Sequence, residues 1–144
     1  MKSKILRSAL TVLACSAALV LASPSFAETL KMKAELKGAS EVPPTTSKGN
    51  GSVKATYDTA SKKLSWKGSY KDLSGPATAA HFHGPGEVGK NAGVAVPIAP
   101  ATSPLEGSAT LTDAQAADLL AGKYYVNIHT AANKGGEIRG QLTK

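Results

Sequence analysis

The sequence predicts an all-β fold, an antiparallel Greek-key β-sandwich of about eight strands with one short helix. Apolar and polar residues alternate in short segments along most of the chain, which is typical of strands with one buried face. Turn residues, mainly glycine, proline, asparagine and serine, separate these segments. Only one segment carries helix-capping residues. Many short strands joined by turns favour two packed antiparallel layers.

The N-terminal segment has the features of a secretory signal peptide. A basic start, Met1–Arg7, precedes the mostly apolar run Ser8–Ala22, and small residues precede Ala27. We therefore expect residues 1–27 to be removed and residues 28–144 to form one domain, exported to the periplasm or secreted. An alternative is a lipid anchor on Cys15, but the apolar run continues past this cysteine. The run is too short for a transmembrane segment.

Charge and cysteine content exclude some classes of function. Loss of Lys2, Lys4 and Arg7 with the leader lowers the formal net charge from +7 to +4. The other lysines mostly alternate with apolar residues and are not interleaved with aromatics, so we interpret them as a solvated sheet face and predict no nucleic-acid binding. The only cysteine, Cys15, leaves with the leader, so the domain has no disulfide and no thiolate ligand.

The first half of the domain shows the clearest strand patterns. Met32 and Trp66 fall on apolar faces and are expected in the core. A turn at Asp58–Lys62 makes the second and third strands a hairpin. The predicted strands cover residues 30–36, 51–58 and 63–70.

The second half contains the predicted helix and the remaining strands. Pro97 confines its segment to a sheet edge. Thr112 and Gln115 form a capping box, and Gly122 ends the helix. The glycine-rich loop 84–93 lacks the lysine and hydroxyl of a phosphate-binding loop. The predicted strands are the segment around His81 and His83, then residues 94–98, 107–111, 123–129 and 137–142.

The three histidines of the chain are the candidate metal ligands. His81 and His83 are two residues apart, so a strand presents both on one face. The same alternation places His129 opposite the apolar Val126 and Ile128. If the two strands are neighbours, three imidazoles converge outside the core. Three nitrogen donors without a thiolate suit Cu(II), or zinc with an open fourth position, and the Irving–Williams order favours copper.

Other polar residues are candidates for supporting roles around this metal ion. Asn127 shares the face of His129 and can hydrogen-bond to it. Glu137 is a fourth ligand or an acceptor for an imidazole N–H, or it pairs with Arg139 as an ordinary ion pair. Arg139 alternatively steers an anion toward the metal. Tyr124 and Tyr125 fall on opposite faces, so one is expected in the core and the other beside the site.

The chain resembles the CHRD domain, a module named after chordin. The resemblance is carried by Ala80–Pro85, Gly122–Thr130 and Gly135–Leu142, and it covers roughly residues 29–142. The combination of His-x-His-Gly-Pro, Tyr-Val-Asn-Ile-His-Thr and Gly-Glu-Ile-Arg-Gly-Gln is specific. It implies a domain class found in exported bacterial proteins, but it supplies no activity.

A more distant likeness connects the chain with copper/zinc superoxide dismutases, and it implies a superoxide dismutase-like or immunoglobulin-like sandwich. His81 and His83 resemble that family's His-x-His copper pair, His129 its later Val-His ligand, and Arg139 its active-site arginine. The bridging histidine, the zinc ligands and the disulfide have no counterpart. The likeness therefore supports a mononuclear three-histidine site and argues against a dinuclear dismutase.

Three functions are compatible with these features. The favoured one is a non-catalytic copper-binding module for sequestration, delivery or tolerance, because no nucleophile triad or carboxylate cluster is present. The second is a recognition or scaffold domain that uses the Gly84–Gly93 loop or a sheet edge, without metal and with an unknown protein partner. The third is a mononuclear copper redox enzyme.

Overall fold

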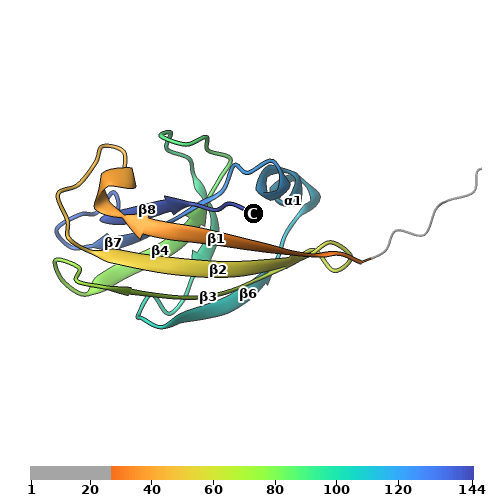
Figure 1. Ribbon diagram of the computed structural model, residues 1–144, viewed down its shortest axis with the longest axis horizontal. Helices are drawn as coiled ribbons and strands as arrows, with labels where there is room; N and C mark the ends of the chain where they lie inside the picture. The colour runs from red at the N-terminus through yellow and green to blue at the C-terminus, as the bar shows by residue number, and fades with distance from the viewer. Residues whose placement is uncertain (1–26) are drawn as a thin grey trace, which may run out of the picture.

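The computed structural model describes residues 27–144, which form eight strands, one α-helix and one short 3-10 helix (Figure 1). The predicted signal peptide, including Cys15, lies outside the described residues except for Ala27. The elements are β1 (Thr29–Lys37), η1 (Gly38–Ser40), β2 (Asn50–Asp58), β3 (Lys63–Lys71), β4 (Ala77–His83), β5 (Val94–Ile98), β6 (Leu105–Thr110), α1 (Asp113–Leu120), β7 (Tyr125–Thr130) and β8 (Ile138–Gln141).

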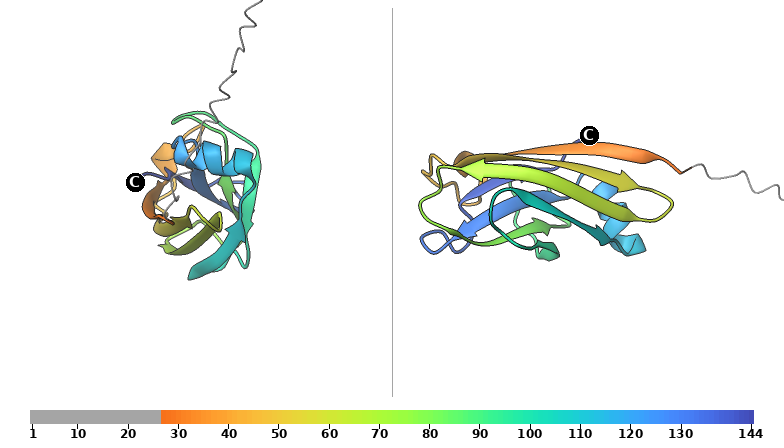
Figure 2. Two further views of the ribbon diagram at one scale, coloured as in Figure 1. Left: turned by 90° about the vertical axis from the view of Figure 1, so that its right-hand side faces the viewer. Right: turned by 90° about the horizontal axis from the view of Figure 1, so that it is seen from below.

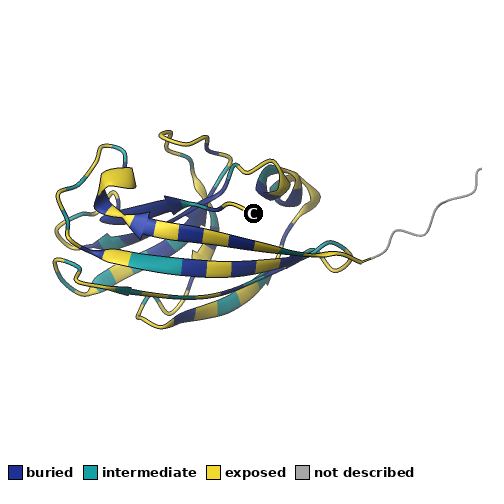
Figure 3. Cartoon of the chain, viewed as in Figure 1, coloured by how far each residue is buried: buried dark blue, intermediate teal, exposed yellow. Residues whose placement is uncertain are grey.

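Alternation of burial along the strands confirms the sequence pattern. In β1 the apolar residues Met32, Ala34 and Leu36 are buried, and the charged residues between them are exposed. Figure 3 shows the same stripes of buried and exposed residues along β1 and β2. One face of each strand therefore supplies the core, as period-two patterning requires.

All eight described strands belong to one antiparallel sheet, in the order β5-β4-β7-β8-β1-β2-β3-β6. The pairing of Lys37 with Arg139 joins β1 to β8, so the two halves of the sandwich are continuous rather than separate sheets. The edge strands β5 and β6 contact each other, and the sheet nearly closes into a barrel (Figure 2). The placement of β5 at an edge confirms the expectation from Pro97.

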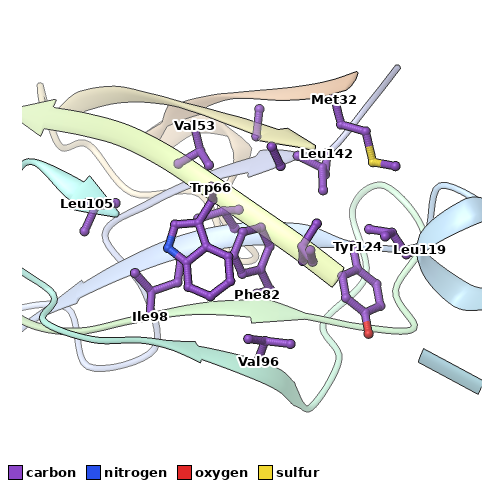
Figure 4. Close-up of a cluster of buried hydrophobic side chains, with 14 of the residues drawn as sticks. Met32, Val53, Trp66, Phe82, Val96, Ile98, Leu105, Leu119, Tyr124 and Leu142 are labelled. Atoms are coloured by element: carbon purple, nitrogen blue, oxygen red, sulfur yellow. The ribbon is translucent and has the colours of Figure 1, made fainter. Parts of the chain in front are cut away.

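The core lies between the two halves of the sheet. Trp66 of β3 meets Phe82 of β4 edge to face across this space, with ring centroids 5.1 Å apart (Figure 4). Trp66, Met32 and Tyr124 are all buried in the core, as the sequence predicts for the first two. Aromatic pairs of this kind stabilise beyond their buried area by about 1 kcal/mol.

The helix α1 covers one end of the sandwich (Figures 1 and 2). The predicted capping box is present: Gln115 N–H donates to the Thr112 hydroxyl, and the Thr112 N–H donates to the Gln115 side chain. Ala116 and Leu119 are buried, whereas Leu120 is exposed. Within residues 27–144 no helix combines the length and apolarity needed to cross a membrane.

The observed strand bounds differ slightly from those predicted. β6 begins at Leu105, and β7 begins at Tyr125. Leu105 is buried and pairs with Gly68, which extends β6 toward its N-terminus. These shifts leave the faces of all histidines unchanged.

Candidate metal centre

Strands β4 and β7 are antiparallel neighbours, which places the three histidines together. His81 pairs with Asn127, and Ala79 pairs with His129, so all three rings lie on the outer face, opposite Phe82 and Ile128. One ring nitrogen from each histidine lies within 4.8 Å of the others. The convergence expected from the alternation of residues is present in the structure.

Backbone carbonyls orient two of the three rings. His83 Nδ1 lies 2.9 Å from the carbonyl oxygen of Ala92, and His129 Nδ1 lies 2.9 Å from that of Lys134. A carbonyl only accepts hydrogen bonds, so each Nδ1 carries the proton and each Nε2 keeps its lone pair. Both rings therefore hold the tautomer that coordinates through Nε2.

The third ring, His81, completes a pair of closely spaced donors. Its Nδ1 lies 3.1 Å from Nε2 of His129. Two nitrogens bound to one ion at about 2.0–2.1 Å have this separation when they subtend about 100° at the metal. Without an ion, the His81 Nδ1–H donates to His129 Nε2, so coordination of a metal through this Nδ1 requires its proton to move to Nε2.

The arrangement is close to a metal site but is not fully contracted. Two ligands of one ion cannot be farther apart than about 4.1 Å at these bond lengths. The three ligand nitrogens lie within 4.8 Å of one another, which exceeds this value, so the widest pair must close by at least about 0.7 Å on an ion. The Nε2 atom of His83 is buried and has no hydrogen-bond partner among residues 27–144, which leaves it available for such a contact.

Burial tunes the protonation of the cluster. It lowers the pKa of His81 below the usual 6.5, and the neighbouring His129 and His83 lower it further. Burial also lowers the pKa of His83, although its contact with the Ala92 carbonyl acts in the opposite direction. Neutral imidazoles are the metal-binding form, so these two ligands are ready at neutral pH.

Tyr125 and Arg139 support His83 from the side. Tyr125 stacks on His83, and the guanidinium carbon of Arg139 lies 3.4 Å from the centre of the tyrosine ring. The Arg139 guanidinium donates to Asn91 Oδ1 and to the carbonyl of Lys90. Of the two tyrosines, Tyr124 therefore faces the core and Tyr125 borders the site, as expected from their alternation.

Glu137 lies apart from the histidines, and its predicted pairing with Arg139 is not formed among the described residues. Its carboxylate accepts hydrogen bonds from side chains on three separate segments, namely Ser47, Ser74, Thr130 and Asn133. Thr130 lies two residues from Ile128 and shares its face of β7, opposite His129. Hydroxyl and amide donors, rather than the guanidinium or the histidine cluster, satisfy this carboxylate.

Asn127 lies between the cluster and a buried carboxylate that sequence analysis missed. It pairs with both His81 and Arg139 across the sheet. Glu41, from the loop after η1, is buried, and burial raises the pKa of Glu41 to about 7 although Arg139 lowers it. A Cβ on Gly136 would collide with Glu41 Oε1 and lie 2.6 Å from Asn127 Nδ2, so only glycine allows this approach. No pattern around Glu41 in the sequence marks it as buried.

The structure defines a class of protein: an all-β domain with a three-histidine cluster on the outer face of a nearly closed antiparallel sheet. The chain belongs to the CHRD domain family, because the model of that family matches residues 32–142. This match extends from β1 to the residue after β8 and includes every residue of the cluster. Neither a curated protein nor a solved structure matched the chain.

Proposed function

We propose that this CHRD-domain protein is exported and binds one copper ion through His81, His83 and His129, for sequestration, delivery or tolerance of copper. The buried Nε2 atom of His83, which lacks a hydrogen-bond partner in the described part of the chain, carries the proposal. A buried polar atom without a hydrogen bond is costly, and an ion shared with the other two rings removes that cost. The leader-like N-terminus supports export.

The donor set favours copper over other ions. Three imidazoles without a carboxylate do not suit magnesium or calcium, which prefer oxygen ligands. Zinc fits the same nitrogens, but copper(II) binds such ligands more strongly. The sheet holds the three ligands, backbone carbonyls orient the rings of His83 and His129, and His81 can change its tautomer.

A Cu(II) titration of residues 28–144 tests this function. We expect one copper ion per chain and nitrogen hyperfine coupling in the electron paramagnetic resonance spectrum of the bound Cu(II). The loaded protein should also have a higher melting temperature, because an ion that binds only the folded state stabilises it. The His81→Ala/His83→Ala variant should lose all three effects. Lys134→Ala removes an exposed side chain beside His129 and keeps the carbonyl, so it serves as the matched control.

Two results would contradict the proposal. If the wild type binds Cu(II) no more tightly than the His81→Ala/His83→Ala variant does, the histidines do not form a metal site. An unchanged melting temperature with excess copper would favour a recognition domain in which the histidines are incidental. Superoxide removal by the loaded protein, measured against free copper, separates a carrier from a redox enzyme.

A further inference from the structure

The four-stranded half of the sheet that lacks the histidines carries a row of lysines on its outer face. Lys33 of β1 lies directly opposite Lys54 of β2, and Lys54 lies directly opposite Lys67 of β3. All three side chains are exposed. We call these three residues the lysine row.

The lysine row is unfavourable for the isolated fold. Directly opposed residues of antiparallel strands have Cβ atoms about 5 Å apart, and like charges at these positions destabilise the pair. Lys67 has a counter-ion, because its Nζ lies 3.0 Å from Glu106. In the part of the chain that the structure describes, Lys33 and Lys54 form no ion pair. Packing does not require lysine on β2 and β3, since the neighbouring outward positions on these strands hold Thr56 and Ser65.

A groove runs beside the lysine row over β2, β3 and β6. Its cavity volume is about 570 Å³, and both Lys54 and Lys67 line it. A second row of residues crosses its floor: Thr56 pairs with Ser65, and Ser65 pairs with Ser108. The groove therefore presents the ammonium groups of Lys54 and Lys67 along one side, where the Glu106 carboxylate pairs with Lys67, and hydroxyl groups along the other; Lys63 lines it as well.

We propose that this groove binds an anionic polysaccharide, a chain of sugars that carry carboxylate or sulfate groups. The ammonium groups of the lysine row fit the acidic groups of such a chain, and the hydroxyl row fits its hydroxyl groups. An acidic chain bound here would neutralise the positive charges of Lys33 and Lys54, which form no ion pair among the described residues. This inference is independent of the copper proposal, because the groove and the histidines lie on different halves of the sheet.

Other anionic macromolecules fit the face less well. Trp66 lines the groove but is only 4% exposed, and Tyr57 is buried in the core, so neither aromatic ring is accessible for stacking on nucleic-acid bases. The exposed large hydrophobic residues among those described are Val88, Val94 and Leu120, which lie outside β1, β2, β3 and β6. The face therefore lacks an apolar anchor for a membrane surface.

Binding of polygalacturonate, a polymer of carboxylated sugars, tests the proposal at low ionic strength. We expect wild-type residues 28–144 to bind it, less tightly as salt is added, and not to bind the neutral polymer dextran. Lys33→Gln/Lys54→Gln/Lys67→Gln should weaken binding about tenfold or more, since three charge contacts are lost. Lys48→Gln/Lys90→Gln/Lys134→Gln removes the same charge from exposed loop residues and should retain binding within about threefold.

A fold control accompanies these measurements. The variant of the lysine row should keep a melting temperature at least equal to that of the wild type, because the substitutions remove like charges that repel one another across the strands. Equal weakening in both triple variants would overturn the proposal, since only net charge would then matter. Absence of wild-type binding, or tighter binding to duplex DNA or to anionic vesicles than to polygalacturonate, would overturn it as well.

Discussion

Tyr125 lies flat against His83, with ring centroids 4.9 Å apart and planes within 2° of each other. The two residues also share an anchor, because the carbonyl of Ala92 lies 2.9 Å from His83 Nδ1 and 3.3 Å from the Tyr125 hydroxyl. Arg139 lies over the same tyrosine ring and holds loop residues Lys90 and Asn91. The loop that contains Lys90, Asn91 and Ala92 and the strand β7 therefore hold the imidazole of His83 in one orientation. A metal ligand fixed in this way is preorganised for binding.

We expect Tyr125→Leu to lower Cu(II) affinity by up to about tenfold, because the stacked ring no longer holds His83; such contacts are worth about 1 kcal/mol. Tyr125→Phe keeps the ring and should retain most of the affinity. Competition titrations against a chelator measure both values. Tyr124→Phe, in the core, is the control, and unchanged affinity in Tyr125→Leu would show that the stack does not position His83.

Copper affinity should stay nearly constant from about pH 8 to about pH 6.5 and fall at lower pH, as protons compete for the imidazoles. The pKa values of His81 and His83 are lowered, so fewer protons have to be displaced near pH 6.5 than from ordinary histidines. Titrations across this range, with a flexible His-x-His peptide as the comparison, check the prediction. A fall in affinity that begins at a higher pH than in the peptide would contradict it.

The sequence predicted the parts of the site that depend on strand alternation. The faces of His81, His83 and His129 follow from period two, and their convergence needed only the adjacency of β4 and β7. It did not predict the contacts made by loops, because loop conformation is not periodic. The carbonyls of Ala92 and Lys134 that orient two rings are backbone groups that every residue has, so no side-chain pattern marks them.

Glu137→Gln should destabilise the fold by about 2–4 kcal/mol at neutral pH, with little effect on copper affinity in the protein that remains folded. Burial alone would raise the pKa of Glu137, but hydrogen bonds from Ser47, Ser74 and Thr130 outweigh it and hold this pKa at about 2. Denaturant unfolding of the variant and the wild type measures the difference. Glu106→Gln, which removes an exposed carboxylate, should cost less than about 1 kcal/mol.

The same carboxylate predicts how stability depends on acid. Its pKa is lower in the folded state than the ordinary 4.5, so its contribution is present above pH 4.5 and is lost as the pH falls toward 2. The stability gap between wild type and Glu137→Gln should therefore narrow over that interval. A gap that stays constant down to pH 2 would show that the ionised form is not what the hydroxyls stabilise.

The role of Glu137 illustrates why sequence analysis misplaced one residue. Glu137 and Arg139 carry opposite charges in the predicted strand 137–142, and their pairing was one of the alternatives for Glu137, beside a role as metal ligand or as acceptor for an imidazole N–H. In the structure each finds partners from loops far away in sequence, Ser47 and Ser74 for the carboxylate and Asn91 for the guanidinium. Tertiary contacts that join distant loops override a local pairing.

Glu41 is the subject of the last prediction, because its effect on stability depends on pH in the opposite direction to that of Glu137. Burial raises its pKa from 4.5 to about 7, so the folded protein binds a proton here that the unfolded chain has lost. The contribution of this carboxyl is fully present below pH 4.5 and disappears as the pH rises through about 7. Glu41→Gln cannot ionise and should be more stable than the wild type at about pH 8, by on the order of 1–3 kcal/mol. Urea unfolding at about pH 5 and pH 8 measures the effect, and Glu35→Gln, which removes an exposed carboxylate, is the control. If Glu41→Gln is less stable than the wild type at both pH values, the fold requires the negative charge of Glu41, stabilised by Arg139.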